Sequence, residues 1–143
     1  MQADDEVMRF TTGAGLSDVE NRKQLDGCIR AYSKPDNDFW VWAVVNKPDR
    51  EFVGTCAVVR NDQSQDEIGY RLLRRHWGCG FGQEICDALI DYIIQNMGLK
   101  QIYAFVDERN VASMKILNRS KLEFIEEVRT DSGNIDRTYR WTH

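Results

Sequence analysis

Three glycines at alternate positions lie between an apolar segment and an amphipathic one: Gly78, Gly80 and Gly82. Glycines let backbone N–H groups converge on an anion, and the first amides of a helix favour a phosphate at the same place. The apolar segment before them, residues 67–73, has the character of a strand, so the order is strand, glycine turn, helix start. This arrangement predicts a site for a phosphorylated ligand, near which Arg74 and Arg75 could add positive charge.

Hydrophobic periodicity and cap signals place this turn inside one domain, residues 1–143. Ser17 and Glu20 form a capping-box pattern, which predicts a helix from Ser17 to about Tyr32. A second helix runs from the glycine turn to Gly98, which closes it as the residue after the helix, and Asn110 caps a third. The predicted strands are 39–45, 52–60, 67–74, 102–106, 124–129 and 135–141. The order is helix, three-stranded meander, helix, strand, helix and hairpin. It indicates a mixed α/β (α+β) fold with helices on the faces of a sheet.

Composition and charge argue against several classes of partner. The formal net charge is −4 and the pI is near 5.2, so bulk attraction to nucleic acid or to an anionic membrane is not expected. The four cysteines form no C-x-x-C pair and only two histidines are present, so we expect reduced thiols and no metal site. An apolar leader and a run of transmembrane length are both missing, which favours a cytoplasmic protein.

Three ordered segments carry a family resemblance. The strand Glu67–Leu72 is E-I-G-Y-R-L, the loop Trp77–Glu84 is W-G-C-G-F-G-Q-E, and residues 110–113 are N-V-A-S. In this order and spacing they resemble the GNAT superfamily of acyl-CoA-dependent N-acetyltransferases. More narrowly, they resemble its RimJ/RimL branch, which includes N-terminal acetyltransferases of ribosomal proteins. Asp5–Phe10 is similar to a segment before the second helix of that branch, so the resemblance covers about residues 4 to 141.

The resemblance implies the GNAT fold, in which helices flank a central, mixed, mostly antiparallel twisted sheet. Members of the branch usually begin with a strand and a helix before the segment that Asp5–Phe10 resembles, and this chain has no residues for them. We therefore expect the sheet to lack its first strand, unless a second copy in a homodimer covers the gap. The tyrosine that many GNAT enzymes use as a general acid is replaced by Leu117.

Acetyl-CoA, without a metal, is the implied acyl donor. Its pyrophosphate would lie on the backbone amides of the glycine loop, those of Gly78, Cys79, Gly80, Phe81, Gly82 and Gln83. Arg75, with Arg74, would add charge near the phosphates. Main-chain groups of Leu72 and Leu73 would bind the pantetheine arm. Asn110 either reaches that arm or simply caps its helix.

The implied chemistry is direct attack of an amine on the thioester, with an N–H that we assign to Leu73 polarising the carbonyl. The amine must be neutral, and an α-amine with a pKa of about 8 needs less help than a lysine at about 10.4. We expect Glu67 to be the base, directly or through water; alternatively, it is a structural strand-edge carboxylate. Ser113 would protonate the departing thiolate, unless it only satisfies local backbone groups. The rival bases are Glu126, Glu127 and Asp131.

The predicted function is acetyl-CoA-dependent N-acetylation of a primary amine, with the N-terminal amine of a peptide or protein as the favoured acceptor. A polyamine or another small amine is the enzymatic alternative, and the negative net charge suits it. A module that binds coenzyme A without turnover is the alternative from another class. The missing upstream elements and the absent tyrosine favour that alternative.

Overall fold

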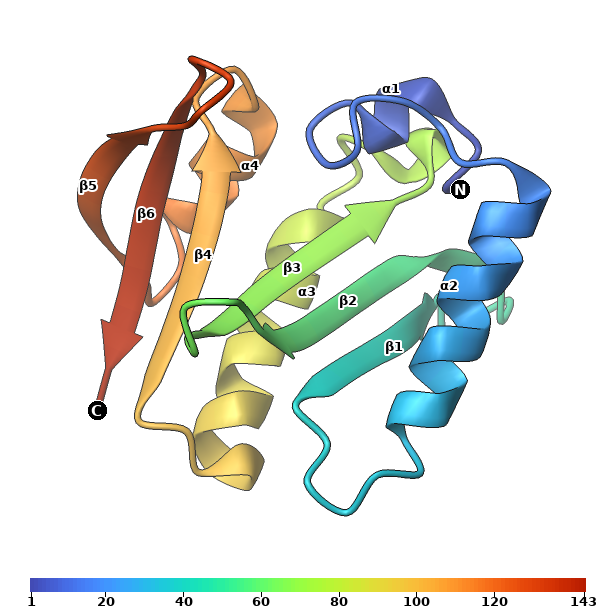
Figure 1. Cartoon of the computed structure of the whole chain (residues 1–143), viewed down its shortest axis with the longest axis horizontal. Coiled ribbons are helices and arrows are strands. Elements are labelled where there is room, and N and C mark those ends of the chain that lie inside the picture. The colour runs from blue at the N-terminus through green and yellow to red at the C-terminus, as the bar shows by residue number, and fades with distance from the viewer.

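Six strands form one sheet in the order β1-β2-β3-β4-β6-β5 in the computed structural model, which describes residues 1–143 (Figure 1). The strands are β1 (Phe39–Val45), β2 (Phe52–Arg60), β3 (Asp66–Leu72), β4 (Gln101–Asp107), β5 (Glu123–Arg129) and β6 (Ile135–Thr142). The helices are α1 (Asp5–Met8), α2 (Asp18–Ala31), α3 (Phe81–Tyr92) and α4 (Val111–Leu117). The predicted elements and their order are confirmed, and α1 is an additional short helix.

All neighbouring strands pair antiparallel except β3 and β4, which run parallel and share a single register pair, Glu67 with Tyr103. Beyond this pair the two strands diverge toward their C-terminal ends, as Figure 1 shows. Backbone groups on the edges that face each other are therefore left without partners from the neighbouring strand. Strands β3 and β4 thus form a wedge whose apex is the Glu67–Tyr103 pair.

Helix α3 passes behind the sheet and carries much of the core (Figure 1). Cys86, Ile90 and Ile93 are completely buried on its apolar side. Burial of each large apolar side chain contributes about 1.5–3 kcal/mol, which fixes α3 and the glycine turn before it. The helix continues as a π-helical turn, Ile93–Met97, and ends at Gly98, whose φ of 64° is the predicted left-handed terminus.

Helices α1 and α2 lie on the opposite face of the sheet. The start of α2 is the predicted capping box: Ser17 Oγ accepts from the N–H of Glu20 at 3.3 Å, and the Glu20 carboxylate accepts from the N–H of Ser17 at 2.8 Å. Helix α1 ends in the fully buried Met8, whose Sδ lies 3.9 Å from Nη1 of Arg71 on β3. The N-terminal segment is therefore anchored over β3.

One strand boundary is wrong. The third strand was expected to reach Arg74, but β3 ends at Leu72, and a 3-10 turn, Arg74–His76, follows. The carbonyl of Leu72 accepts a hydrogen bond from the indole Nε1 of Trp77 at 3.0 Å, which bends the chain back toward the strand end. The basic pair therefore belongs to the turn and not to the strand.

Strand β1 is an edge strand, and no strand of this chain pairs with its outer side. A homodimer that covers this edge stays a prediction. No helix combines the length and the apolar character needed to cross a membrane. The structure gathers no group of three or more His, Cys, Asp or Glu residues that could hold a metal ion.

Candidate active site

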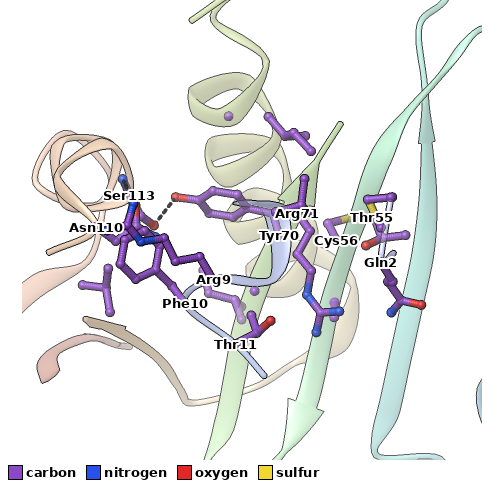
Figure 2. Close-up of a pocket in the computed structure, with 18 of the residues that line it drawn as sticks. Gln2, Arg9, Phe10, Thr11, Thr55, Cys56, Tyr70, Arg71, Asn110 and Ser113 are labelled. Atoms are coloured by element: carbon purple, nitrogen blue, oxygen red, sulfur yellow. Dashed lines mark hydrogen bonds between the residues drawn. The ribbon is translucent and has the colours of Figure 1, made fainter. Parts of the chain in front are cut away.

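The wedge between β3 and β4 opens into a groove of about 2310 Å³ that also reaches the glycine loop, the N-terminal segment and α4. Figure 2 shows part of its lining, with residues of β3, α4 and the N-terminal segment facing the same space. Several predicted site residues line this groove, among them Glu67, Leu72, Gly78, Gly80, Gly82, Gln83, Asn110 and Ser113.

The direction of the backbone groups along β3 corrects one assignment. The N–H of Leu73 donates to the carbonyl of Val53 on β2 at 2.9 Å, so it is not free to polarise a carbonyl. Antiparallel pairing alternates along a strand, so Tyr70 and Leu72 direct their backbone groups away from β2 and toward the wedge. The Leu72 assignment fits this parity. Tyr70, which we did not assign, takes the place expected for Leu73.

The backbone of the glycine loop has a conformation that would suit the predicted anion site. Gly78 and Gly80 have φ angles of 72° and 87°, in the left-handed region that favours glycine. The first helical hydrogen bond runs from the N–H of Glu84 to the carbonyl of Gly80 at 3.2 Å. No N–H group from Gly78 to Gln83 donates to a protein acceptor. The loop therefore presents a run of available amides at the N-terminus of α3, where the helix macrodipole adds to their field.

Gly82 has a different role from the other two glycines. A Cβ at this position would lie 2.7 Å from Cδ1 of Ile116, so the missing side chain allows α3 to pack closely on α4. The side-chain amide of Gln83 donates to Asp87 one turn further along α3, at 3.2 Å to each carboxylate oxygen. Cys79 is exposed and its thiol is 3.5 Å from the carbonyl of Trp77, so its side chain points out of the loop.

The two arginines before the loop point toward carboxylates. Arg75 pairs with Glu51 at 2.5 Å, and Arg74 lies 3.9 Å from Asp4. All four side chains are at least one third exposed, and exposed ion pairs contribute only about 0–1 kcal/mol. An anion on the loop could therefore draw either arginine away from its partner at little energetic cost.

Ser113 and Tyr70 meet across the groove. Their hydroxyl oxygens are 3.0 Å apart, with Tyr70 reaching from β3 to α4 (Figure 2). Asn110 fixes the other side of this contact, because its Oδ1 accepts from the N–H of Ser113 at 3.1 Å and caps α4. Burial raises the pKa of Tyr70, so its phenol stays protonated. Leu117, at the position of the family tyrosine, is only 2% exposed and belongs to the core.

Glu67 lies at the apex of the wedge, as half of the single β3–β4 register pair. Burial is the main influence on its carboxyl and raises its pKa; Asp136 adds to the rise, and a hydrogen bond from Asn61 opposes it. The rival bases are more remote: Glu126 and Glu127 are exposed on the edge strand β5, and Asp131 lies in the hairpin turn. Among the carboxylates considered, Glu67 is the one at the wedge.

The chain matches a family of known proteins. Residues 1–123 match the family model described as "Acetyltransferase (GNAT) domain". The chain is also similar to a protein from Bacillus licheniformis named "Uncharacterized N-acetyltransferase p20", with 31% identity over 118 residues. This match covers 81% of the chain and 66% of the relative, so the chain spans just under two thirds of that relative's length.

Three solved structures share the fold. A GNAT-family acetyltransferase from Bacillus anthracis has a TM-score of 0.83 at 14% identity, covering 99% of this chain and 84% of that one. A ribosomal-protein-S5-alanine acetyltransferase from Vibrio fischeri has a TM-score of 0.78 at 16% identity, covering 99% and 82%. A spermidine N-acetyltransferase mutant, SpeG F149A from Vibrio cholerae, has a TM-score of 0.71 at 14% identity, covering 91% and 78%.

Proposed function

Because the chain belongs to the acetyltransferase (GNAT) family, we propose that it is an acetyl-CoA-dependent N-acetyltransferase that acts on a primary amine. One observation carries this proposal: the wedge between β3 and β4 opens onto backbone amides, from Gly78 to Gln83, that have no protein acceptor. Free amides at a helix N-terminus suit a pyrophosphate. An open strand edge suits the amide-containing arm of the same molecule.

The residues present fit acetyl-CoA. A Cβ at Gly78 or Gly80 would meet no other atom within 4 Å, so the space in front of the loop is open. Backbone groups of Tyr70 and the N–H of Leu72, whose carbonyl accepts from Trp77, would bind the pantetheine arm, while Arg74 and Arg75 would turn to the phosphates. Acetyl-CoA supplies the activated acyl group, and the chain supplies the groups that orient it and move protons.

Three groups would handle the protons and charge. The Glu67 carboxylate would accept a proton from the acceptor ammonium, directly or through water, and leave a neutral amine. A wedge-facing N–H of Tyr70 or Leu72 would donate to the oxygen of the acyl group. Ser113, held in place by Tyr70 at 3.0 Å, would pass its hydroxyl proton to the departing sulfur and regain a proton from solvent, so that its hydroxyl is restored.

The acceptor class is the finer part of the proposal. The RimJ/RimL resemblance, together with the fold shared with the ribosomal-protein-S5-alanine acetyltransferase, favours a peptide or protein N-terminal amine. The fold shared with the spermidine N-acetyltransferase, together with the net charge of −4, supports a polyamine as the second candidate. A module that only binds coenzyme A is the third, because Leu117 replaces the family tyrosine.

A thiol-release assay with acetyl-CoA and a panel of amines tests the proposal. We expect coenzyme A release that depends on both the amine and the protein. Differential scanning fluorimetry with acetyl-CoA, run in parallel, separates binding from turnover. Stabilisation without release on any amine would favour the binding module, and neither effect would contradict both functions.

A further inference from the structure

Arg71 is a half-buried cation that has no carboxylate partner. It lies on β3 and is half-buried, yet it forms no ion pair. The side chain of Arg71 contacts Met8, with Nη1 lying 3.9 Å from the sulfur atom, which is a weak hydrogen-bond acceptor. Burial lowers the pKa of Arg71, and the influence that acts against this comes from Cys28 and not from a carboxylate. Most of the donors of this guanidinium are therefore available to a ligand.

Figure 2 draws one other labelled cation in this lining, Arg9, beside uncharged polar residues. Thr55 is the register partner of Arg71 on β2, and the figure also draws Thr11 and Gln2, with the Arg71 guanidinium turned away from the Tyr70–Ser113 contact. These neighbours carry hydroxyl and amide groups. All of them line the groove, so the guanidinium lies on the groove wall, on the face of β3 that also carries Glu67.

Strand geometry relates Arg71 to the proposed base. Side chains of Glu67, Gly69 and Arg71 share one face of β3, because alternate residues of a strand point the same way. Gly69 has no side chain, and a Cβ there would meet nothing within 4 Å, so the strand is open between the carboxylate and the guanidinium. Neighbouring positions on this face are about 7 Å apart. A small molecule over Gly69 could therefore reach both groups.

We propose that Arg71 binds a carboxylate of the acceptor, so that the acceptor is an amine that also carries a carboxylate. The inference rests on the proposed acetyltransferase function. The guanidinium can hold a carboxylate through two parallel N–H···O bonds, while Glu67 receives the ammonium at the other end. The carboxylate belongs either to a free amino acid or to an acidic first residue of a peptide. A polyamine would place a second positive charge beside Arg71, which disfavours it.

Matched pairs of acceptors test the contact and distinguish its sources. Alanine against alaninamide tests the α-carboxylate, and a peptide amide that begins with Asp against one that begins with Asn tests the side-chain carboxylate. For at least one pair we expect kcat/KM to be about tenfold higher for the carboxylate member, since hydrogen bonds to charged groups are the stronger ones. Spermidine should be a poorer acceptor than the better of these compounds.

Variants connect the preference to Arg71. Arg71→Gln should remove the preference within the pair, whereas the KM for acetyl-CoA should change less than twofold. Arg71→Lys keeps the charge but not the two-pronged geometry, and should retain part of the preference. Arg30→Gln, on the exposed surface of α2, is the matched control and should behave like the parent. Circular dichroism checks that each variant is folded.

Binding measurements keep the test valid without turnover. Calorimetry with the coenzyme A-saturated protein should show weaker binding of the carboxylate member to Arg71→Gln than to the parent. An unchanged preference in Arg71→Gln, a larger effect on acetyl-CoA than on the acceptor, or spermidine as the best acceptor would each overturn the inference. Absence of turnover with every amine would instead contradict the proposed function, while calorimetry still decides the role of Arg71.

Discussion

The hydroxyl of Tyr70 lies 3.0 Å from Oγ of Ser113, and this contact joins β3 to α4 across 43 residues of sequence. Asn110 holds Ser113 from the other side, because its Oδ1 accepts a hydrogen bond from the backbone N–H of Ser113 at 3.1 Å. The hydroxyl that we assign to the departing sulfur is therefore oriented by a strand residue as well as by its own helix. Because Leu117 offers no hydroxyl, we propose this pair in the place of a tyrosine on α4.

Tyr70→Phe should lower kcat about tenfold, the scale of one hydrogen bond of about 1.4 kcal/mol. The raised pKa of Tyr70 keeps the phenol protonated, so the variant should keep the parent's pH profile. In a double-mutant cycle with Ser113→Ala, the two losses should be non-additive, because both residues act through one contact. Steady-state kinetics on the four proteins measure this.

Tyr92→Phe is the control for that change, since Tyr92 is 49% exposed on α3. Additive losses, or a Ser113→Ala protein with the kcat of the parent, would remove the pair from the mechanism.

Glu67→Gln should slow turnover about 100-fold near neutral pH, the lower end of the range for general base catalysis. The loss should shrink as the pH approaches the acceptor's own pKa, because the free amine then needs no base. In the parent, activity should fall as the pH drops through the raised pKa of Glu67. The acidic limb of a kcat/KM profile reports this. The same limb in Glu67→Gln would assign the base to another group, and Glu126→Gln tests the first rival.

The raised pKa of Glu67 also predicts a change in stability. A carboxyl group that holds its proton more tightly in the folded state adds stability below its unfolded pKa, and this stability is lost as the pH rises through the folded pKa. At neutral pH the parent therefore carries a partly desolvated charge that Glu67→Gln lacks. Urea denaturation should show the variant to be the more stable protein at pH 7. The difference should narrow toward pH 4, and the opposite trend would contradict the burial argument.

Gly80→Val should abolish the stabilisation by acetyl-CoA while the protein still folds. A β-branched residue is strained at a φ of 87°, and relief of this strain would displace the amides of the loop. Gly133→Val is a close control, since Gly133 has a φ of 83° in the distant β5–β6 turn. Both variants should lose about 1–3 kcal/mol of stability, but only Gly80→Val should lose the ligand-induced rise in Tm. If acetyl-CoA raised the Tm of both variants equally, the glycine loop would not be the site that binds it.

Gly82→Ala should destabilise the fold by about 1–3 kcal/mol, because its Cβ would lie 2.7 Å from Cδ1 of Ile116. Ile116→Val removes that methyl group and should recover part of the loss in the double variant. Chemical denaturation of the two single variants and the double variant measures the coupling. Additive losses would mean that α3 and α4 do not meet at these two residues.

Local signals predicted most of the fold. The Ser17–Glu20 capping box, the Asn110 cap and Gly98 each satisfy backbone groups within a few residues, so their sequence pattern is sufficient. The left-handed conformations of Gly78 and Gly80 follow from the same kind of local argument. These features depend on near neighbours in the chain, which a single sequence displays.

The errors concern pairing between distant segments. Leu73 was assigned a free N–H, but the register of β3 against β2 directs this N–H to the carbonyl of Val53. Backbone groups of alternate residues point to opposite sides of a strand, so those of Tyr70 and Leu72 face away from β2 instead. The ion pair between Arg75 and Glu51 is likewise not visible in the sequence, while the contact of Arg75 with a phosphate stays a prediction. The Tyr70–Ser113 contact depends on how α4 packs against β3, which no local pattern contains.

Because side chains alternate between the two faces of β3, substitutions in this strand should have different effects from insertions or deletions. Ile68, Tyr70 and Leu72 point toward the face of the sheet that α3 covers, where the acyl donor would bind. The opposite face, toward α1, is shared by Glu67, Gly69 and Arg71. In the proposed roles, substitutions of Arg71 would change which amine is accepted and substitutions of Glu67 would slow the reaction, while donor binding would be left untouched. Loss of a single residue within the strand would exchange the two sets and disable both at once, so this segment should tolerate replacement far better than insertion or deletion.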